Sequence, residues 1–164
     1  MSAPTASSLL DPFRFLLGSW SGKGVGVWRP DSPFRYREEL LLEVVPDRDL
    51  IHLQQRTFDA ETGPLRHSEQ GFLRLFPAGE AELVVAVPAG YTEIHQGRVE
   101  GTILRLELVT LAVSPRARPL DRTQRRLEFR AGQLHHAVGI AVGSGEVVAH
   151  VASSLERIQG PGAP

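Results

Sequence analysis

The chain has 164 residues, a formal net charge of −1 and no cysteine. This length fits one domain with a substantial core or an enclosed cavity. The balanced charge gives no electrostatic basis for binding nucleic acid or an anionic membrane. The lack of cysteine excludes disulfides, zinc–thiolate sites, iron–sulfur clusters and thiol nucleophiles.

Both ends of the chain are expected to lie outside the folded domain. Residues 1–10 are small and polar, without the basic start and apolar run of a secretory signal. Residues 159–164, rich in glycine and proline, are typical of a flexible tail. No stretch is apolar for long enough to cross a bilayer as a helix. We therefore expect a disordered N-terminus, one domain over residues 11–158 and a cytoplasmic location.

A short helical turn is expected at the start of the domain, with Asp11 as its cap and Pro12 at its first position. The stretch from Leu16 to Trp28 follows, with four glycines and two tryptophans. Glycine permits sharp bends or close backbone approach, and a tryptophan can plug a cavity, so the stretch suits the mouth of a closed β-sheet. An ordinary first strand with glycine bulges is the alternative. A nucleotide-binding glycine loop is excluded, because prolines follow the stretch where a helix would have to begin.

Beyond this stretch, apolar and polar residues alternate with a period close to two, which indicates strands with one wet face. The first long strand places one apolar set on a single face: Phe34, Tyr36, Leu40, Leu42 and Val44. Turn-forming residues, Gln96-Gly97 among them, separate the strands. The further strands are predicted over residues 50–59, 66–76, 82–87, 91–96, 102–113, 123–130, 133–142 and 147–158.

The pattern predicts an all-β fold of about ten antiparallel strands. An up-and-down barrel of the kind found in lipocalins and fatty-acid-binding proteins is favoured over a sandwich, because it leaves no edge strand to protect. Barrels of this size commonly hold one small ligand, so a ligand pocket is expected.

Histidine is the natural soft metal ligand in a chain without cysteine. His52 is expected at an ordinary strand position, and His95, in a polar hairpin arm, is expected in solvent. His135 and His136 are strand neighbours that must point to opposite faces, so they cannot both ligate one metal.

His150 lies in an otherwise apolar strand of small residues. Val148, Ala152 and Ser154 are expected to share its face, which leaves a shallow wall with room for a flat ligand. From the residues alone, His150 is either a core histidine with one hydrogen bond or a ligand-binding residue.

The remaining polar residues show no hydrolytic triad or nucleophile elbow. His67 could pair with Glu69 on the same strand face, and the neighbouring carboxylates Glu38 and Glu39 must point to opposite faces. A basic run lacks the interleaved aromatic residues of a nucleic-acid platform and is expected to be solvated, although one or two of its members could pair with ligand carboxylates. Its members are Arg116, Arg118, Arg122, Arg125 and Arg126.

Several motifs resemble those of the nitrobindin family, small haem-binding β-barrels also described as peroxynitrite isomerases. The family's Gly-x-Trp-x-Gly-x-Gly motif is matched by Gly18, Trp20, Gly22 and Gly24. Residues 34–39, 55–63 and 67–72 resemble its second strand and central hairpin, and the last strand with His150 matches its iron-binding segment. The likeness covers about residues 13–158.

The resemblance implies a ten-stranded barrel with one haem b at its open end. His150 would be the single protein ligand to the iron, with the opposite face of the haem open to nitric oxide or peroxynitrite. Ferric iron would act as the Lewis acid that isomerises peroxynitrite to nitrate, and no other catalytic residue is implied. The expected partners are these small molecules, without nucleic acid or membrane, and a homodimer is left open.

Two departures from the family lie near the implied haem. The family usually has Tyr-Pro-Thr-Ile where this chain has residues 28–31, so Pro30 replaces a threonine beside the haem and removes its hydroxyl. Arg118 takes the place of a lysine near the haem in some members, which keeps the charge but not the shape. Pro30 and Arg118 therefore join His150 as candidate haem-contacting residues.

Two other functions are compatible with the same barrel. It could carry an apolar or flat small molecule without iron, which the altered loop after Trp28 favours. It could also be an interaction domain whose barrel is simply filled. The histidine retained at the ligand position favours the haem protein.

Overall fold

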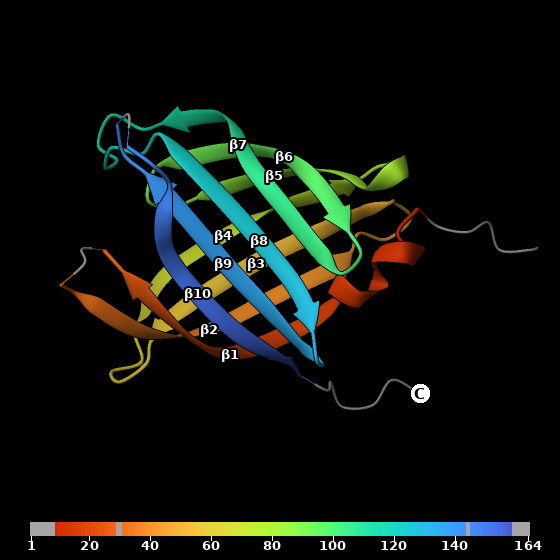
Figure 1. Cartoon of the computed structure of the whole chain (residues 1–164), viewed down its shortest axis with the longest axis horizontal. Coiled ribbons are helices and arrows are strands. Elements are labelled where there is room, and N and C mark those ends of the chain that lie inside the picture. The colour runs from red at the N-terminus through yellow and green to blue at the C-terminus, as the bar shows by residue number, and fades with distance from the viewer. Residues whose placement is uncertain (1–8, 29–30, 144, 159–164) are drawn as a thin grey trace, which may run out of the picture.

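The structure is a computed structural model that describes residues 9–28, 31–143 and 145–158. Ten antiparallel strands close into one barrel, in which each strand pairs with its sequence neighbours and β10 pairs with β1 (Figure 1). The predicted all-β barrel with a short N-terminal helical turn is confirmed. Its elements are η1 (Asp11–Leu16), β1 (Gly18–Val27), β2 (Pro33–Val44), β3 (Leu50–Asp59), β4 (Leu65–Leu75), η2 (Pro77–Gly79), β5 (Glu80–Val87), β6 (Tyr91–Glu100), β7 (Ile103–Val113), β8 (Arg122–Arg130), β9 (Gln133–Ala141) and β10 (Val148–Arg157).

The alternation of residue types decides which side chains fill the barrel. On β2, Tyr36, Leu40 and Leu42 are buried, while Arg35 and Arg37 on either side of Tyr36 are exposed. Successive strand residues point to opposite faces, so this pattern can satisfy both an apolar interior and a wet exterior. Closure then pairs both sides of every strand and leaves no open edge.

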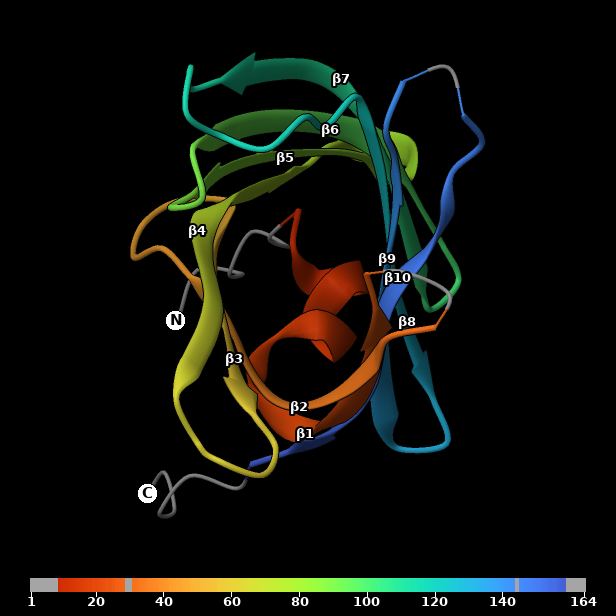
Figure 2. The same cartoon turned by 90° about the vertical axis from the view of Figure 1, so that its left-hand side faces the viewer.

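One end of the barrel is closed by η1, which lies inside its rim (Figure 2). Phe13 and Leu16 of this helix are buried in the core, and the Trp20 indole donates a hydrogen bond from Nε1 to the Leu16 carbonyl at 3.0 Å. Trp20 thus plugs the closed end, as predicted for a tryptophan of the glycine-rich stretch. Among the described residues, no helix has the length and apolar character needed to span a membrane.

Two local predictions are wrong. Asp11 does not cap η1: Leu10 occupies the cap position, and Asp11 instead forms an ion pair with Arg14 at 2.7 Å. The predicted turn at Gly97 is an ordinary part of β6, which continues to Glu100. A Cβ at Gly97 would overlap the backbone of β7, so this glycine serves close strand approach rather than a turn.

The glycine-rich β1 forms the wall from the closed end towards the open end. Gly24 pairs with Tyr36 of β2, and Gly26 pairs with Phe34. A Cβ at either glycine would overlap the ring opposite it. The two aromatic rings therefore lie across β1, in space that any other residue type would fill.

We expect Gly24→Ala to lower the free energy of unfolding by about 1–3 kcal/mol, because its methyl group would overlap the Tyr36 ring. Lys23→Ala, at the adjacent exposed position of the same strand, should change it by no more than about 0.5 kcal/mol. Urea unfolding of both variants measures the difference. Equal losses would show that strand propensity, and not the ring, is responsible.

Candidate functional site

His150 is positioned by a β-bulge near the start of β10, where the pairing with β9 shifts between Ala149 and Val151. The bulge breaks the strict alternation of the strand. Ala152 and Ser154 are exposed, whereas the His150 ring is half-buried. The prediction that Ala152 and Ser154 share the face of His150 is therefore wrong, since periodicity alone does not reveal a bulge.

The His150 ring is held by one hydrogen bond to β1. Its Nδ1 lies 3.0 Å from the carbonyl oxygen of Val27. A carbonyl can only accept, so Nδ1 carries the hydrogen, and the lone pair of the neutral ring is on Nε2. Burial lowers the pKa of His150, which favours the neutral ring. Among the described residues, none is hydrogen-bonded to Nε2.

Aromatic rings and one cation surround His150 at the open end. The centroid of the Trp28 ring lies 4.5 Å from that of His150, and the centroid of the Phe34 ring lies 6.4 Å from it. Arg118 stacks over Trp28, with its guanidinium carbon 5.6 Å from the ring centroid. Tyr91 fixes the Arg118 loop by donating its hydroxyl hydrogen to the Arg118 carbonyl at 2.6 Å. The structure thus brings two predicted site residues, His150 and Arg118, to the same rim through Trp28.

Pro30, the third predicted site residue, lies outside the described residues. The four motif residues lie along β1 and not at the rim: Gly18, Trp20, Gly22 and Gly24. Of these four, Gly24 is next to the Tyr36 ring, which in turn contacts Phe34 beside His150.

Apolar side chains line the open half of the barrel. Three of them pair with the buried residues Thr123, Arg125 and Glu93, and the two on β10 pair with members of this set on β9. Because paired residues share a face, all of these side chains face inward. These inward-facing side chains are at least partly exposed, because no core side chains pack against them at the open end. The set consists of Val138, Ile140, Val148, Val151 and Leu111.

A separate cavity of about 680 Å³ opens in the wall beside this end. Pairing between β4 and β5 ends at Gln70 and Ala86, and the cavity reaches the buried carboxylate of Glu69 beyond that point. His150 and Trp28 are not among its lining residues.

Below the open end, one buried carboxylate accepts hydrogen bonds from side chains of three strands. Glu38 accepts from Ser153 Oγ at 2.6 Å, from His136 Nδ1 at 2.7 Å and from Gln55 Nε2 at 2.9 Å. Burial opposes its ionisation, but the neighbouring His136 and the three donors outweigh this effect and lower the pKa of Glu38. The predicted placement of Glu38 and Glu39 on opposite faces is confirmed, whereas this cluster was not predicted from the sequence.

A second buried cluster crosses the interior from β4 to β8. Arg125 forms two hydrogen bonds to Glu69, through Nη1 and through Nη2 at 3.0 Å, and its Nη2 also donates to Glu93 at 3.0 Å. His95 beside it is fully buried, with its Nε2 2.7 Å from Thr123 Oγ1, and burial lowers its pKa to about 3. The predictions that His95 and Arg125 are solvated are therefore wrong, because their partners come from strands far away in the sequence.

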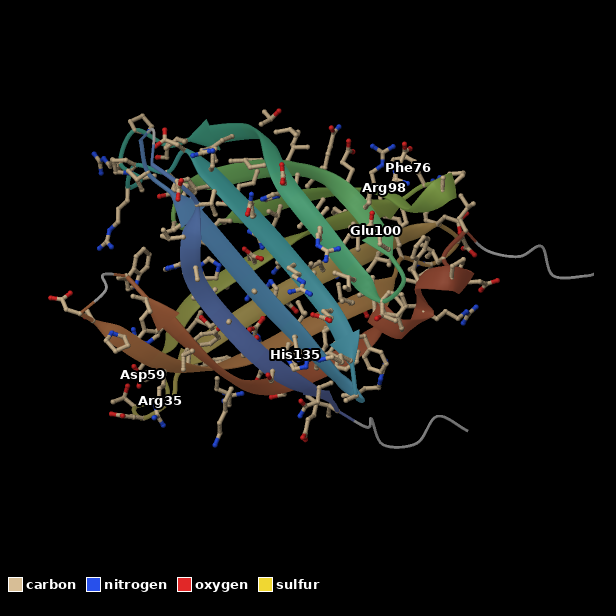
Figure 3. All side chains as sticks on the ribbon, viewed as in Figure 1. Arg35, Asp59, Phe76, Arg98, Glu100 and His135 are labelled. Atoms are coloured by element: carbon tan, nitrogen blue, oxygen red, sulfur yellow. The ribbon has the colours of Figure 1, made fainter. Side chains whose placement is uncertain are left out.

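The other histidines occupy the predicted kinds of position. His67 Nε2 lies 3.3 Å from Glu69, which confirms that pair, and His52 pairs on the surface with Glu43 at 3.3 Å. His135 lies on the outer face of β9, as Figure 3 shows, while its neighbour His136 is buried.

Comparisons with known proteins find relatives over most of the chain. Residues 9–157 match the family model described as "THAP4-like, heme-binding beta-barrel domain". "Peroxynitrite isomerase 1" of Rhodococcus jostii (strain RHA1) is 37% identical over 155 residues, which cover 94% of this chain and 85% of that protein. "Peroxynitrite isomerase 1" of Mycobacterium tuberculosis (strain ATCC 25618 / H37Rv) is 35% identical over 149 residues, covering 87% of this chain and 90% of that protein. The crystal structure of Rv2717c from M. tuberculosis matches with a TM-score of 0.83 and 30% identity, covering 94% of this chain and all of that one.

We expect Arg125→Met to lower the free energy of unfolding by about 3–5 kcal/mol, because it leaves Glu69 and Glu93 buried without their cation. The control is Arg126→Met on the next residue of β8, which removes only the ion pair between the exposed Arg126 and the partly exposed Glu128 and should cost below about 1 kcal/mol. Urea unfolding measures both. A small loss in Arg125→Met would mean that the two carboxylates are protonated or hydrated in the folded state.

Proposed function

The chain belongs to the THAP4-like haem-binding β-barrel domain family, and we propose that it holds one haem b through His150 and converts peroxynitrite to nitrate. The observation that carries the proposal is the state of His150 at the open end. Its Nδ1 is engaged by Val27, and its lowered pKa favours a neutral ring with a lone pair on Nε2. A neutral imidazole nitrogen is the form of histidine that ligates iron.

The residues at the open end fit a haem. The macrocycle is flat and apolar, and the inward-facing aliphatic residues of β9 and β10 offer it a matching wall. Haem also carries two propionates, and Arg118 at the rim can pair with one of them. The Val27 carbonyl would orient the His150 ring and increase its basicity, as partners behind a metal-bound histidine do.

Bound ferric haem would supply a Lewis-acidic iron for the rearrangement of peroxynitrite to nitrate. The chain itself would bind and orient. His150 would fix the cofactor, Trp28 and Phe34 would limit the access of water to the imidazole, and Arg118 would balance anionic charge at the rim. The relatives named peroxynitrite isomerase support this reaction class.

A second candidate function is the carriage of a flat apolar molecule without iron. The packing of Trp28 against His150, with Arg118 stacked on Trp28, favours this carrier function. These side chains could cover a bound ligand other than haem equally well. In that case a hydrophobic dye should bind in the barrel, and stoichiometric haem should not displace it. Displacement by one equivalent of haem would exclude the carrier.

We expect the chain to bind ferric haem with a sharp Soret band that saturates at one equivalent, and His150→Ala to abolish that band. His135→Ala, which removes a histidine from the outer face of the neighbouring strand, should leave it intact. Absorption titration gives the result, and circular dichroism checks that each variant keeps its β-structure. An unchanged Soret band in His150→Ala would remove His150 from the ligand role.

Arg118→Ala should speed the loss of haem to an acceptor protein several-fold, because it removes the cation at the rim. Arg116→Ala, in the same exposed loop, serves as the control and should leave the loss rate unchanged. Stopped-flow absorption measures both rates. Equal rates in the two variants would reject a pairing between Arg118 and a propionate.

A further inference from the structure

The wall of the barrel is interrupted where β4 runs on beyond its partner β5. Pairing between the two strands ends at Gln70 and Ala86, although β4 continues towards the open end. Continuing the register would place Pro88 opposite Ser68, and a proline has no backbone N–H to donate to a neighbouring strand. The sequence at the end of β5 therefore stops the pairing before the rim.

The cavity of about 680 Å³ lies at this interruption and contacts both faces of the wall. Glu69 and Val87 contribute buried side chains of the inner face, whereas Gln70 and Ala86 contribute exposed side chains of the outer face. Successive strand residues point to opposite faces, so a space lined by both sets crosses the wall. We call this space, between residues 68–70 of β4 and residues 86–88, the side opening.

The side opening lies across the barrel from His150. In the closed order of strands, β5 is separated from β10 by β6 to β9 in one direction and by β1 to β4 in the other. Figure 2 looks into the open end and shows β4 and β10 on opposite sides of the barrel. A flat ligand held by His150 would therefore turn its second face towards the wall that contains the side opening.

The mouth of the barrel beside His150 is covered in a different way. Trp28 packs against His150 with ring centroids 4.5 Å apart, and the guanidinium carbon of Arg118 lies 5.6 Å from the centroid of the Trp28 ring. This contact joins the end of β1 to the loop between β7 and β8. A ligand that approached His150 from the mouth would meet this aromatic and cationic cover.

The lining of the side opening suits molecules without charge. It is largely apolar, with Val87 and Pro88 among its residues, and its one charged side chain among the described residues is Glu69. Burial opposes the ionisation of Glu69, but the attraction of Arg125 outweighs this effect and lowers the pKa of Glu69. Arg125 is shared with Glu93, so the group keeps a net negative charge that disfavours anions.

We propose that the side opening is the route by which small uncharged ligands, such as nitric oxide, reach the face of the haem opposite His150. The inference rests on the proposed function, because it requires haem in the open half of the barrel. The propionates and Arg118 would stay at the mouth, while the ligand enters through an apolar passage on the other side.

The chain has no cysteine, so a single introduced thiol can carry a removable plug. Ala86→Cys and Ser68→Cys place the thiol on the two sides of the side opening, and Gln124→Cys places it at an exposed position of β8 outside the lining. A bulky aromatic methanethiosulfonate forms a mixed disulfide with the thiol, and dithiothreitol removes it. Labelling and release precede the addition of ferric haem. Nitric oxide association is then measured by laser flash photolysis of each haem-loaded form.

We expect the plug on Ala86→Cys or Ser68→Cys to slow nitric oxide association several-fold, and its release to restore the rate. The same plug on Gln124→Cys should leave the rate unchanged. Where the bulky plug hinders haem loading, the smaller methyl methanethiosulfonate replaces it. A haem-loaded protein whose rate is unaffected by plugs at both sides would overturn the side opening as the entry route.

The Soret titration of the unlabelled chain separates this outcome from failure of the proposed function. A chain that binds no haem would overturn the proposed function and the entry route together. A chain with a full Soret band, but with equal nitric oxide association rates in all labelled forms, would overturn only the entry route.

Discussion

The absence of side chains at Gly24 and Gly26 is the constraint on which the open half of the barrel depends. Two rings of β2 use this space to cross β1, so that Tyr36 extends over Gly24 towards β10 and Phe34 approaches His150 on β10. With any larger residue in β1, the rings would have to turn towards the opening, or the strands would have to separate. The glycines therefore shape the site by leaving room for these two rings.

The interior is divided along the barrel axis into regions of different polarity. The closed end is a dry core sealed by η1 and Trp20. Towards the middle, the carboxylates of Glu38 and Glu69 are buried, which is favourable only because Glu38 accepts hydrogen bonds from three strands and Glu69 is paired with Arg125. The open end is apolar and aromatic, with a neutral histidine. A flat apolar ligand would be confined to the open end, because moving deeper would separate paired charges.

Much of the fold could be predicted from the sequence, because a period of two is a local signal and a closed barrel is the arrangement of such strands that leaves no edge unpaired. Family motifs also directed attention to His150. The bulge beside His150 could not be predicted from periodicity, and the burial of His95 and Arg125 depends on partners from distant strands. One signal was present but unused: Glu38 lies on the apolar face of its strand, between Tyr36 and Leu40, and an acid in such a place indicates a buried partner.

Ligation of haem by His150 is tested by observing the protonation of its ring with long-range ¹H–¹⁵N nuclear magnetic resonance of the full chain near neutral pH. We predict a neutral ring with its hydrogen on Nδ1 and a bare Nε2, whose signal is lost or strongly shifted as one equivalent of ferric haem is added. The His135 ring, on the outer face, supplies the reference signal. A hydrogen on Nε2, a doubly protonated ring, or a His150 signal unchanged by haem would contradict this prediction.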